Sequence, residues 1–223
     1  MKTALAVILF AAVVAPSAFA ANTASSPQTK DANHELKEAT RLVKQMKKDS
    51  EMARALAKAK GIFLVPDYGR GAFVVGGSGG QGVLFAKKNG EWVGPVFYNL
   101  GSVSIGAQAG VSAGQVAMVL MSDKAVNSFQ GDNSFSLDAN AGLTIVNWSA
   151  RGQASLGTSD VIVWSDTEGA YAGVAFSASD INADEHANRA FYDTVGATPG
   201  TILTGRVHAI DPAARNLEQA LGA

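Results

Sequence analysis

Cysteine is absent from the 223-residue chain. The protein therefore forms no disulfide and has neither a thiolate zinc site nor a thiol nucleophile. A lipoprotein anchor is excluded as well, because that modification needs a cysteine at the cleavage point. Charged residues are few, at 17%, whereas hydrophobic residues reach 47%. This composition is typical of a globular chain that buries a core.

Residues 1–20 have the pattern of a secretory signal peptide. Met1 and Lys2 form a short basic start, residues 4–15 are mostly apolar, and Ala18-Phe19-Ala20 matches an A-x-A cleavage site. We expect cleavage after Ala20 and export of the remaining chain to the periplasm or the extracellular space, either free or peripheral on a membrane. Export without disulfides is typical of a bacterial protein.

The segment that follows is the basic part of a chain whose overall net charge is −1. Residues 30–60 contain nine basic and five acidic side chains, and so carry a net charge of +4. Residues 21–30 are predicted to be a disordered lead-in. Residues 31–60 lack glycine and proline and are predicted to form one long helix with a possible break near Asp49-Ser50. Because the body of the chain is mildly acidic, we expect no nucleic-acid partner.

Eleven of the 24 glycines lie between residues 72 and 121. They alternate with apolar and aromatic residues, which predicts bent β-structure and not a flexible linker. Asn89-Gly90 predicts a two-residue hairpin turn. The remaining strand patterns cover residues 62–65, 72–76, 82–87, 92–98, 103–111, 115–121, 134–146, 152–164, 169–178 and 201–209.

Short helices are predicted at residues 122–130, 184–192 and 211–221, beginning at the capping residues Ser122, Asp184 and Asp211. Residues 31–223 are thus predicted to form a single domain with a helix at 31–60, a β-rich body at 61–209 and a C-terminal helix at 211–221. The fold class is α+β: a Gly-rich, mainly antiparallel sheet or barrel, flanked by the long N-terminal helix and the short C-terminal helices.

Motifs for nucleotide binding and hydrolysis occur without their structural context. Residues 77–82 satisfy GxGxxG, but a strand pattern follows where a dinucleotide site needs a helix. Ser78 and Ser112 each satisfy GxSxG, and Ser112, Asp166 and His208 even follow the order of a hydrolase triad. A nucleophile elbow also needs a helix after the serine, so serine hydrolysis is retained only as a minor alternative.

The three histidines, His34, His186 and His208, belong to three different predicted elements. Asp184, Glu185 and His186 are metal-capable, but adjacent helix positions do not converge on one ion. We therefore predict no metal site, no cofactor and no enzymatic activity.

The ordered motifs of the β-rich body resemble the SYLF domain family. The similar segments include GGSGGQGVLFAK at 76–87, Trp92-x-x-Pro95-x-Phe97, Ser104-x-Gly106-x-Gln108-x-Gly110, Val116–Met121, Tyr171–Val174 and Ala187–Tyr192. The resemblance implies a non-catalytic module that binds anionic phospholipids. Some eukaryotic members also act on actin, a role that we do not expect for a chain with a bacterial-type export signal.

A lipid-binding surface is predicted on the N-terminal helix. At 100° per residue, Lys37, Arg41, Lys44 and Lys48 form one stripe, which would be attracted to an anionic bilayer by about 1 kcal/mol per side chain. The apolar stripe, predicted to pack inward, comprises Leu36, Ala39, Val43, Met46, Ala53 and Ala57. The acidic residues are predicted to cluster on another side, apart from both stripes, and comprise Asp31, Glu35, Glu38 and Asp49.

Three alternatives remain open at this stage. In the first, the basic stripe is only the solvated outer face of a docked helix. In the second, the protein is an envelope structural or interaction protein that binds lipid incidentally. An outer-membrane barrel is a third interpretation, opposed by the charged first helix and the polar last helix.

Overall fold

The fold is described from a computed structural model, which covers residues 27–69, 79–105, 114–131, 134–137, 142–148, 158–166 and 176–222. An eight-stranded sheet forms its centre, with the strand order β5-β8-β3-β2-β1-β4-β7-β6. Neighbouring described strands are antiparallel except β6 and β7, which are parallel. The strands are β1 (Gly61–Tyr68), β2 (Gly80–Lys88), β3 (Glu91–Ile105), β4 (Gly114–Leu120), β5 (Phe135–Leu137), β6 (Ile145–Asn147), β7 (Val161–Ser165) and β8 (Phe176–Ala183).

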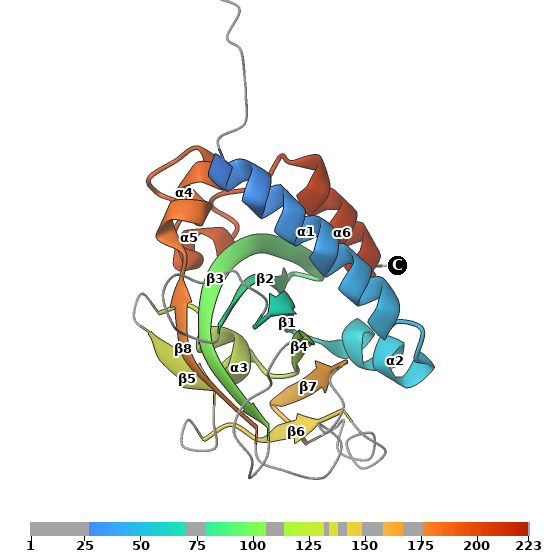
Figure 1. Cartoon of the computed structure of the whole chain (residues 1–223). Coiled ribbons are helices and arrows are strands. Elements are labelled where there is room, and N and C mark those ends of the chain that lie inside the picture. The colour runs from blue at the N-terminus through green and yellow to red at the C-terminus, as the bar shows by residue number, and fades with distance from the viewer. Residues whose placement is uncertain are drawn as a thin grey trace, which may run out of the picture.

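The described helices are α1 (Pro27–Met46), α2 (Ser50–Lys58), α3 (Asp123–Asn127), α4 (Glu185–Tyr192), α5 (Pro199–Leu203) and α6 (Pro212–Gly222). Most of them lie on the outside of this curled sheet or at its end, whereas α3 lies on its inner side (Figure 1). Figure 1 shows α1 and α6 side by side across the strands, while the sheet bends around α3. The predicted α+β class, with a mainly antiparallel sheet flanked by helices, is therefore confirmed.

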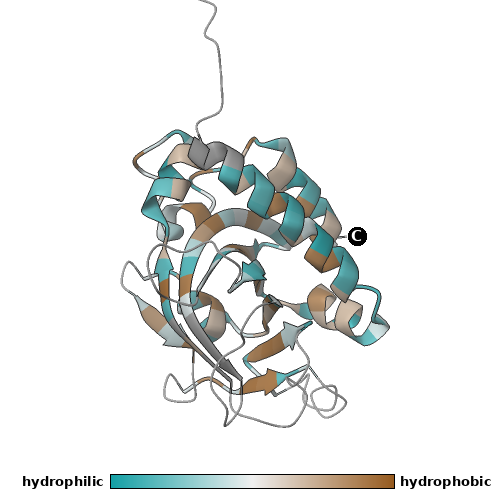
Figure 2. Ribbon diagram, in the orientation of Figure 1, coloured by the Kyte–Doolittle hydropathy of each residue, from teal (hydrophilic) through white to brown (hydrophobic). Residues whose placement is uncertain are grey.

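The two faces of the sheet bury two separate apolar clusters. One cluster, on the side of α3, contains Phe63, Tyr98 and Phe129, whose rings contact one another at centroid distances of 5.2–5.9 Å. The other cluster joins alternate strand residues such as Ile62 and Phe85 to the inward faces of α1, α2 and α6. Figure 2 shows hydrophilic residues along the outward sides of these helices.

Local capping and turn chemistry explains most of the element boundaries. Asn89 and Gly90 have φ values of 54° and 89°, as the tight hairpin between β2 and β3 requires. Ser122 Oγ accepts the Ala125 N–H to begin α3, and Asp184 Oδ1 accepts the Ala187 N–H to begin α4. The predictions of the hairpin and of these two helix starts are confirmed.

The N-terminal helical region differs from one continuous helix at 31–60. Helix α1 begins at Pro27, so the last four residues of the predicted disordered lead-in are helical, and the chain breaks after Met46. Asp49 begins α2 by accepting the N–H groups of Glu51 and Met52 at 2.8 and 3.3 Å. The break near Asp49-Ser50 is thus confirmed.

This break resets the helical phase, and the predicted apolar stripe is wrong beyond it. Ala53 is only half-buried and Ala57 is exposed. The residues of α2 that pack inward are Met52, Ala55 and Leu56.

The predicted strand at residues 201–209 is also wrong. Helix α5 occupies its first part, because Pro199 suits the first turn and Thr198 caps it. The Thr198 side chain accepts the Thr201 N–H, and Thr201 Oγ1 accepts the Thr198 N–H. This reciprocal capping box satisfies the backbone N–H groups of Thr198 and Thr201 at the start of a helix, so the segment needs no strand partner for them.

Glycine in β2 permits a close approach to β1. A Cβ at Gly82 would lie 2.7 Å from the Phe63 ring and 2.8 Å from the Leu64 carbonyl oxygen. Both distances are too short for a side chain, so this glycine is required by packing. The strand β2 begins at Gly80, where a dinucleotide site would need a helix.

Several predicted features lie outside the described residues. They are the signal peptide, the strand at 72–76, residues 106–113 with Gly106, Gly110 and Ser112, and the start of the strand at 169–178. Within the described part of the chain, no helix is both long and apolar enough to cross a membrane.

Candidate functional site

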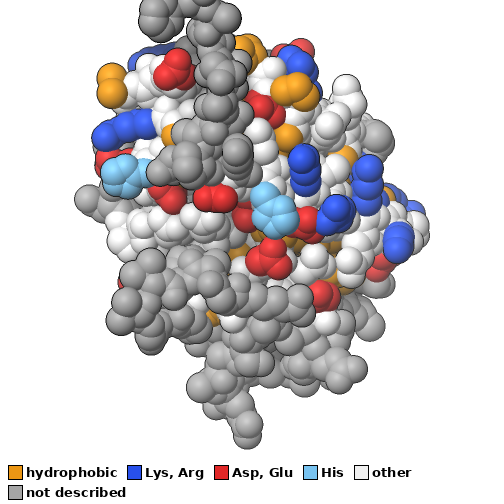
Figure 3. All heavy atoms as spheres, turned by 45° about the horizontal axis from the view of Figure 1, so that its top comes forward, with side chains coloured by type: hydrophobic (Ala, Val, Ile, Leu, Met, Phe, Trp, Pro, Cys, Tyr) orange, Lys and Arg blue, Asp and Glu red, His pale blue; other side chains and the backbone are white. Residues whose placement is uncertain are grey.

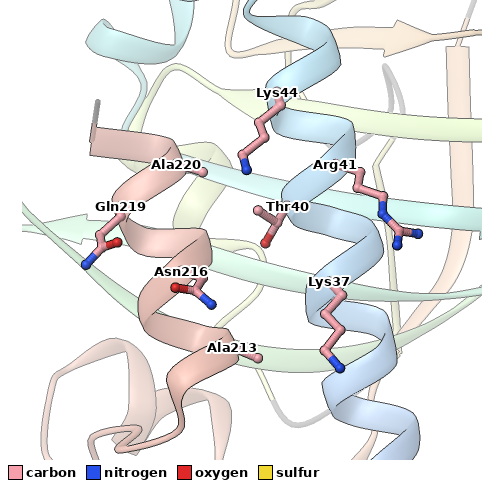
Figure 4. Close-up of a pocket in the computed structure, with 8 residues that line it drawn as sticks. All are labelled: Lys37, Thr40, Arg41, Lys44, Ala213, Asn216, Gln219 and Ala220. Atoms are coloured by element: carbon pink, nitrogen blue, oxygen red, sulfur yellow. The ribbon is translucent and has the colours of Figure 1, made fainter.

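The candidate site is a groove between α1 and α6, with a volume of about 580 Å³. Helix α1 forms one wall and α6 forms the other (Figure 4). The described lining residues are Lys37, Thr40, Arg41 and Lys44 from α1, and Ala213, Asn216, Gln219 and Ala220 from α6.

Helical spacing places the three basic residues on the same face of α1. Lys37, Arg41 and Lys44 follow at steps of four and three residues and are all exposed. The opposite face of α1 is held against the sheet by fully buried residues such as Leu36 and Val43. Because the apolar residues hold one face of α1 against the sheet, the basic residues on the opposite face are directed outward.

Helix α6 supplies a small and uncharged wall. Its buried face contains Ala214, Leu217 and Leu221, which pack against the same core as α1. Asn216 and Gln219 line the groove and carry amide N–H donors, and Figure 4 shows Asn216 extending toward α1 and Gln219 directed away from it. Alanines at 213 and 220 leave space between the helices. The groove therefore combines hydrogen-bond donors with room for a ligand.

The charge of the groove is of one sign. The described residues that line it include no aspartate or glutamate. Figure 4 shows Lys44 extending toward α6, whereas Arg41 is directed to the other side of α1, where it forms an exposed ion pair with Glu38. Figure 3 shows several Lys and Arg side chains toward the right of the view and others at its left and top, with acidic side chains between them. The groove is thus suited to an anion.

The structure brings together three of the four predicted basic residues. Lys48 is exposed, but it lies in the turn after α1 and does not line the groove. Its inclusion on the helical stripe is wrong, because α1 ends at Met46.

The neighbouring Lys47 has a structural role that the sequence pattern did not indicate. Its Nζ donates to the carbonyl oxygens of Ala220 and Leu221 at 2.6 and 3.1 Å, near the end of α6. Burial, and secondarily the charge of Lys87, lowers the pKa of Lys47. A lysine at a helix C-terminus satisfies terminal carbonyls and favours the helix dipole. Lys47 therefore fixes the second wall of the groove relative to the first.

A second groove, of about 530 Å³, lies beyond Lys47 and contains charges of both signs. Lys87 Nζ donates to the Ala57 carbonyl oxygen at 2.8 Å and lies 4.8 Å from the centre of the Trp92 ring. Glu91 and Glu218 also line this groove. Both lysines that line it, Lys47 and Lys87, donate to backbone carbonyls near helix ends, and the groove also contains acids, so it is less suited to an anion.

Glu35 lies on the buried side of α1, so its predicted place on a side apart from the apolar stripe is wrong. Only 7% of the residue is exposed, because it faces the core between Ala32 and Ala39. Desolvation, followed by the charges of Asp67 and Glu38, raises its pKa to about 8. Of the other predicted acids, Asp31 is exposed, Glu38 pairs with Arg41, and Asp49 caps α2.

The structure places two members of the alternative hydrolase triad in separate local contacts. Asp166 Oδ1 accepts the Gln115 backbone N–H at 2.7 Å, at the end of β7. His208 follows α5, and its charge acts on Glu218 of α6. Ser112 lies outside the described residues.

The positions of the described histidines and carboxylates can be compared with the geometry that a metal site needs. Among these residues, no group of three or more His, Asp or Glu side chains is arranged to hold a metal ion. His34 and His186 are both exposed, and Asp184 uses one carboxylate oxygen to cap α4.

Comparison with known proteins places this fold in a family. Residues 101–223 match the family described as Ysc84, Las17-binding protein actin regulator. The chain belongs to this family, which confirms the resemblance to the SYLF domain.

Individual relatives are similar over most of the chain. Protein YSC84 of Saccharomyces cerevisiae is 30% identical over 211 residues, which cover 87% of this chain and 45% of that protein. LAS seventeen-binding protein 3 of the same species is 31% identical over 172 residues, covering 73% and 37%. Human SH3 domain-containing YSC84-like protein 1 is 26% identical over 144 residues, covering 63% and 42%. The chain spans less than half the length of these curated relatives.

Proposed function

We propose that this protein is an exported, non-catalytic lipid-binding protein that holds anionic phospholipid head groups in the groove between α1 and α6. The observation that carries the proposal is the charge of this groove. Lys37, Arg41 and Lys44 of α1 line it, although Arg41 also pairs with Glu38 on the other side of the helix. Two amide residues of α6 complete the lining, and the described lining residues include no acid. Cations and N–H donors are the groups that recognise a phosphate.

The size and position of the groove support this assignment. A volume of about 580 Å³ accommodates a glycerophosphate head group, and both walls lie on the outer side of the molecule. The groove walls contain no large apolar side chain to enter the bilayer core, so the interaction proposed here is electrostatic and superficial. Family membership supports the same class of function, because the SYLF resemblance implies a module that binds anionic phospholipids.

The family description refers to Las17 binding and to actin regulation, and the name of one yeast relative refers to LAS seventeen. We do not extend these partners to this chain. The proposed location is outside the cytoplasm, because residues 1–20 have the pattern of a signal peptide. The intact mass of the exported protein is expected to correspond to a chain beginning at Ala21, and a mass that includes Met1 would contradict export by cleavage.

Neutralising the groove is expected to weaken vesicle binding. The triple variant Lys37→Gln, Arg41→Gln and Lys44→Gln removes three charges, each contributing at most about 1 kcal/mol near an anionic surface. Binding should therefore fall by up to roughly a hundredfold at low salt, since about 1.4 kcal/mol corresponds to tenfold. The measurement is flotation with phosphatidylglycerol vesicles, compared with phosphatidylcholine vesicles, over a range of salt concentrations.

The matched control changes Arg54, Lys58 and Lys60 to glutamine. These residues are exposed on and after α2, outside the groove, and their neutralisation removes the same net charge. If both triple variants lose binding equally, attraction is a property of the net charge and the groove assignment fails. If neither variant loses binding, the basic residues only solvate the outside of the helices.

A further inference from the structure

A third and smaller cavity lies beneath the N-terminal half of α1. Its volume is about 80 Å³, and it is formed where α1, β2, β3 and the start of α4 meet. The described lining residues are Asp31, Ala32, Glu35, Gln81, Phe97, Tyr98, Asp184, His186 and Ala187.

Glu35 is the unusual member of this set. It is 7% exposed, and its Oε1 is inaccessible to solvent with no hydrogen-bond partner among the residues that the structure describes. Buried carboxylates are normally paired or hydrogen-bonded, because removing an unpaired charge from water is costly. An orphaned acceptor of this kind in a cavity wall indicates a missing partner.

The charged groups that face Glu35 do not supply that partner. Asp31 and Glu38 on α1 and Asp67 on β1 are acids, and Asp184 at the start of α4 is another. Gln81 directs its amide nitrogen to Asp184 Oδ2 at 3.4 Å, and His186 lies at the exposed rim. No lysine or arginine is among the described lining residues. The cavity therefore has an excess of acceptors and of negative charge.

The chemistry of these acceptors selects the class of ligand. The described His, Asp and Glu side chains are not arranged to hold a metal ion. A primary ammonium group combines a positive charge with three N–H donors, and it reaches acceptors through ordinary hydrogen bonds. A cavity volume of about 10–15 Å³ is enough to hold one water molecule. The cavity of about 80 Å³ therefore accommodates a group of several heavy atoms.

We propose that this cavity binds a primary ammonium group, carried by a small amine or by an ethanolamine head group, with Glu35 as its counter-ion and Asp31 and Asp184 as further acceptors. The site is separate from the basic groove, because Glu35 lies on the inward face of α1 and the groove lysines lie on the outward face. The two proposals therefore succeed or fail independently.

Binding should release a proton at neutral pH. Burial and the acids Asp67 and Glu38 raise the pKa of Glu35 to about 8, so the empty cavity contains a protonated carboxyl group below that pH. An ammonium ion favours the carboxylate and must displace this proton. The apparent affinity for the amine is therefore expected to rise about tenfold per pH unit between pH 6 and pH 8.

The test uses ethylammonium chloride and, at equal ionic strength, tetramethylammonium chloride, which has charge but no N–H donor. Ethylammonium is expected to raise the melting temperature of the wild-type protein at pH 8.5 and to lower the pKa of Glu35, followed by the NMR shift of its side-chain carboxyl carbon. Glu35→Gln should abolish the thermal response. Glu185→Gln, an exposed substitution on α4 outside the cavity, should retain it.

The source of the ammonium group is distinguished by a second arm. Flotation with vesicles that contain phosphatidylethanolamine, but not with phosphatidylcholine alone, and its loss in Glu35→Gln, would identify a lipid head group. If ethylammonium raises the melting temperature but Glu35→Gln does not change vesicle binding, the ligand is a free amine and not a lipid head group. Equal responses to both salts, or an unchanged Glu35 pKa in wild type, would overturn the proposal and leave the cavity to water.

Discussion

The free energy of unfolding of the wild-type protein is expected to fall as the pH rises from about 5 to about 8, and Glu35→Gln is expected to remove much of this fall. The Glu35 pKa is raised from an ordinary 4.5 to about 8 by burial first, and then by the charges of Asp67 and Glu38. Between these two values the folded protein retains a proton that the unfolded chain has released. Stability therefore decreases with rising pH in this window and becomes independent of Glu35 above it.

The expected size of this effect is large for a single side chain. One pKa unit corresponds to about 1.4 kcal/mol, so the interval gives an effect on the order of 4 kcal/mol between pH 5 and pH 9. Urea unfolding of both proteins at pH 5, 7 and 9 measures it, and the difference between them removes contributions shared with other titrating groups. Glu185→Gln serves as the exposed control. Parallel pH profiles for wild type and Glu35→Gln would show that the carboxyl group is ionised normally.

The burial of Glu35 shows where a helical wheel is insufficient. Leu42 lies two turns after Glu35 on the same face of α1 and is fully buried. The predicted apolar stripe does not include Leu42, and adding it widens the stripe toward Glu35 without deciding whether that edge is buried. The tertiary position of α1 against β2 and β3 decides which edge of the stripe is covered, and no local pattern contains that information.

Elements defined by local chemistry were predictable. Asn89-Gly90 and the caps Ser122 and Asp184 act through neighbouring backbone groups, so their effect follows from the sequence alone. The helix α5 was not predictable in this way. The apolar residues within 201–209 favour a strand, but the capping box of Thr198 and Thr201 stabilises a helix instead.

The candidate site was predictable on one wall only. The spacing of Lys37, Arg41 and Lys44 follows from a regular helix, and all three are among the residues that line the groove. The second wall depends on packing between elements more than 170 residues apart, as the bond from Lys47 to Ala220 illustrates. Such a contact has no local signature, so neither the groove nor the role of Lys47 emerged from periodicity.

The second large expected effect concerns Asn188, which joins α4 to the sheet. Its side chain is completely buried. Its Oδ1 accepts the Phe97 N–H at 2.9 Å, and its Nδ2 donates to the carbonyl oxygens of Phe97 and Asp184 at 3.0 and 2.9 Å. The register between β3 and β8 begins one residue later, at Tyr98 and Ala183. The asparagine therefore completes the backbone pairing of β3 where β8 ends.

Asn188→Ala is expected to destabilise the protein by about 3 kcal/mol, because it leaves buried backbone groups of Phe97 without their side-chain partner. For a chain of this size the melting temperature should fall by roughly 6–12 °C. Asn188→Asp keeps one acceptor but loses both donated bonds and buries a charge, so it should not restore stability. Asn127→Ala, an exposed substitution at the end of α3, is the control. A melting temperature for Asn188→Ala close to that of the control would show that α4 is held by its apolar contacts, such as the edge-to-face packing of Phe191 on Phe97, and not by this amide.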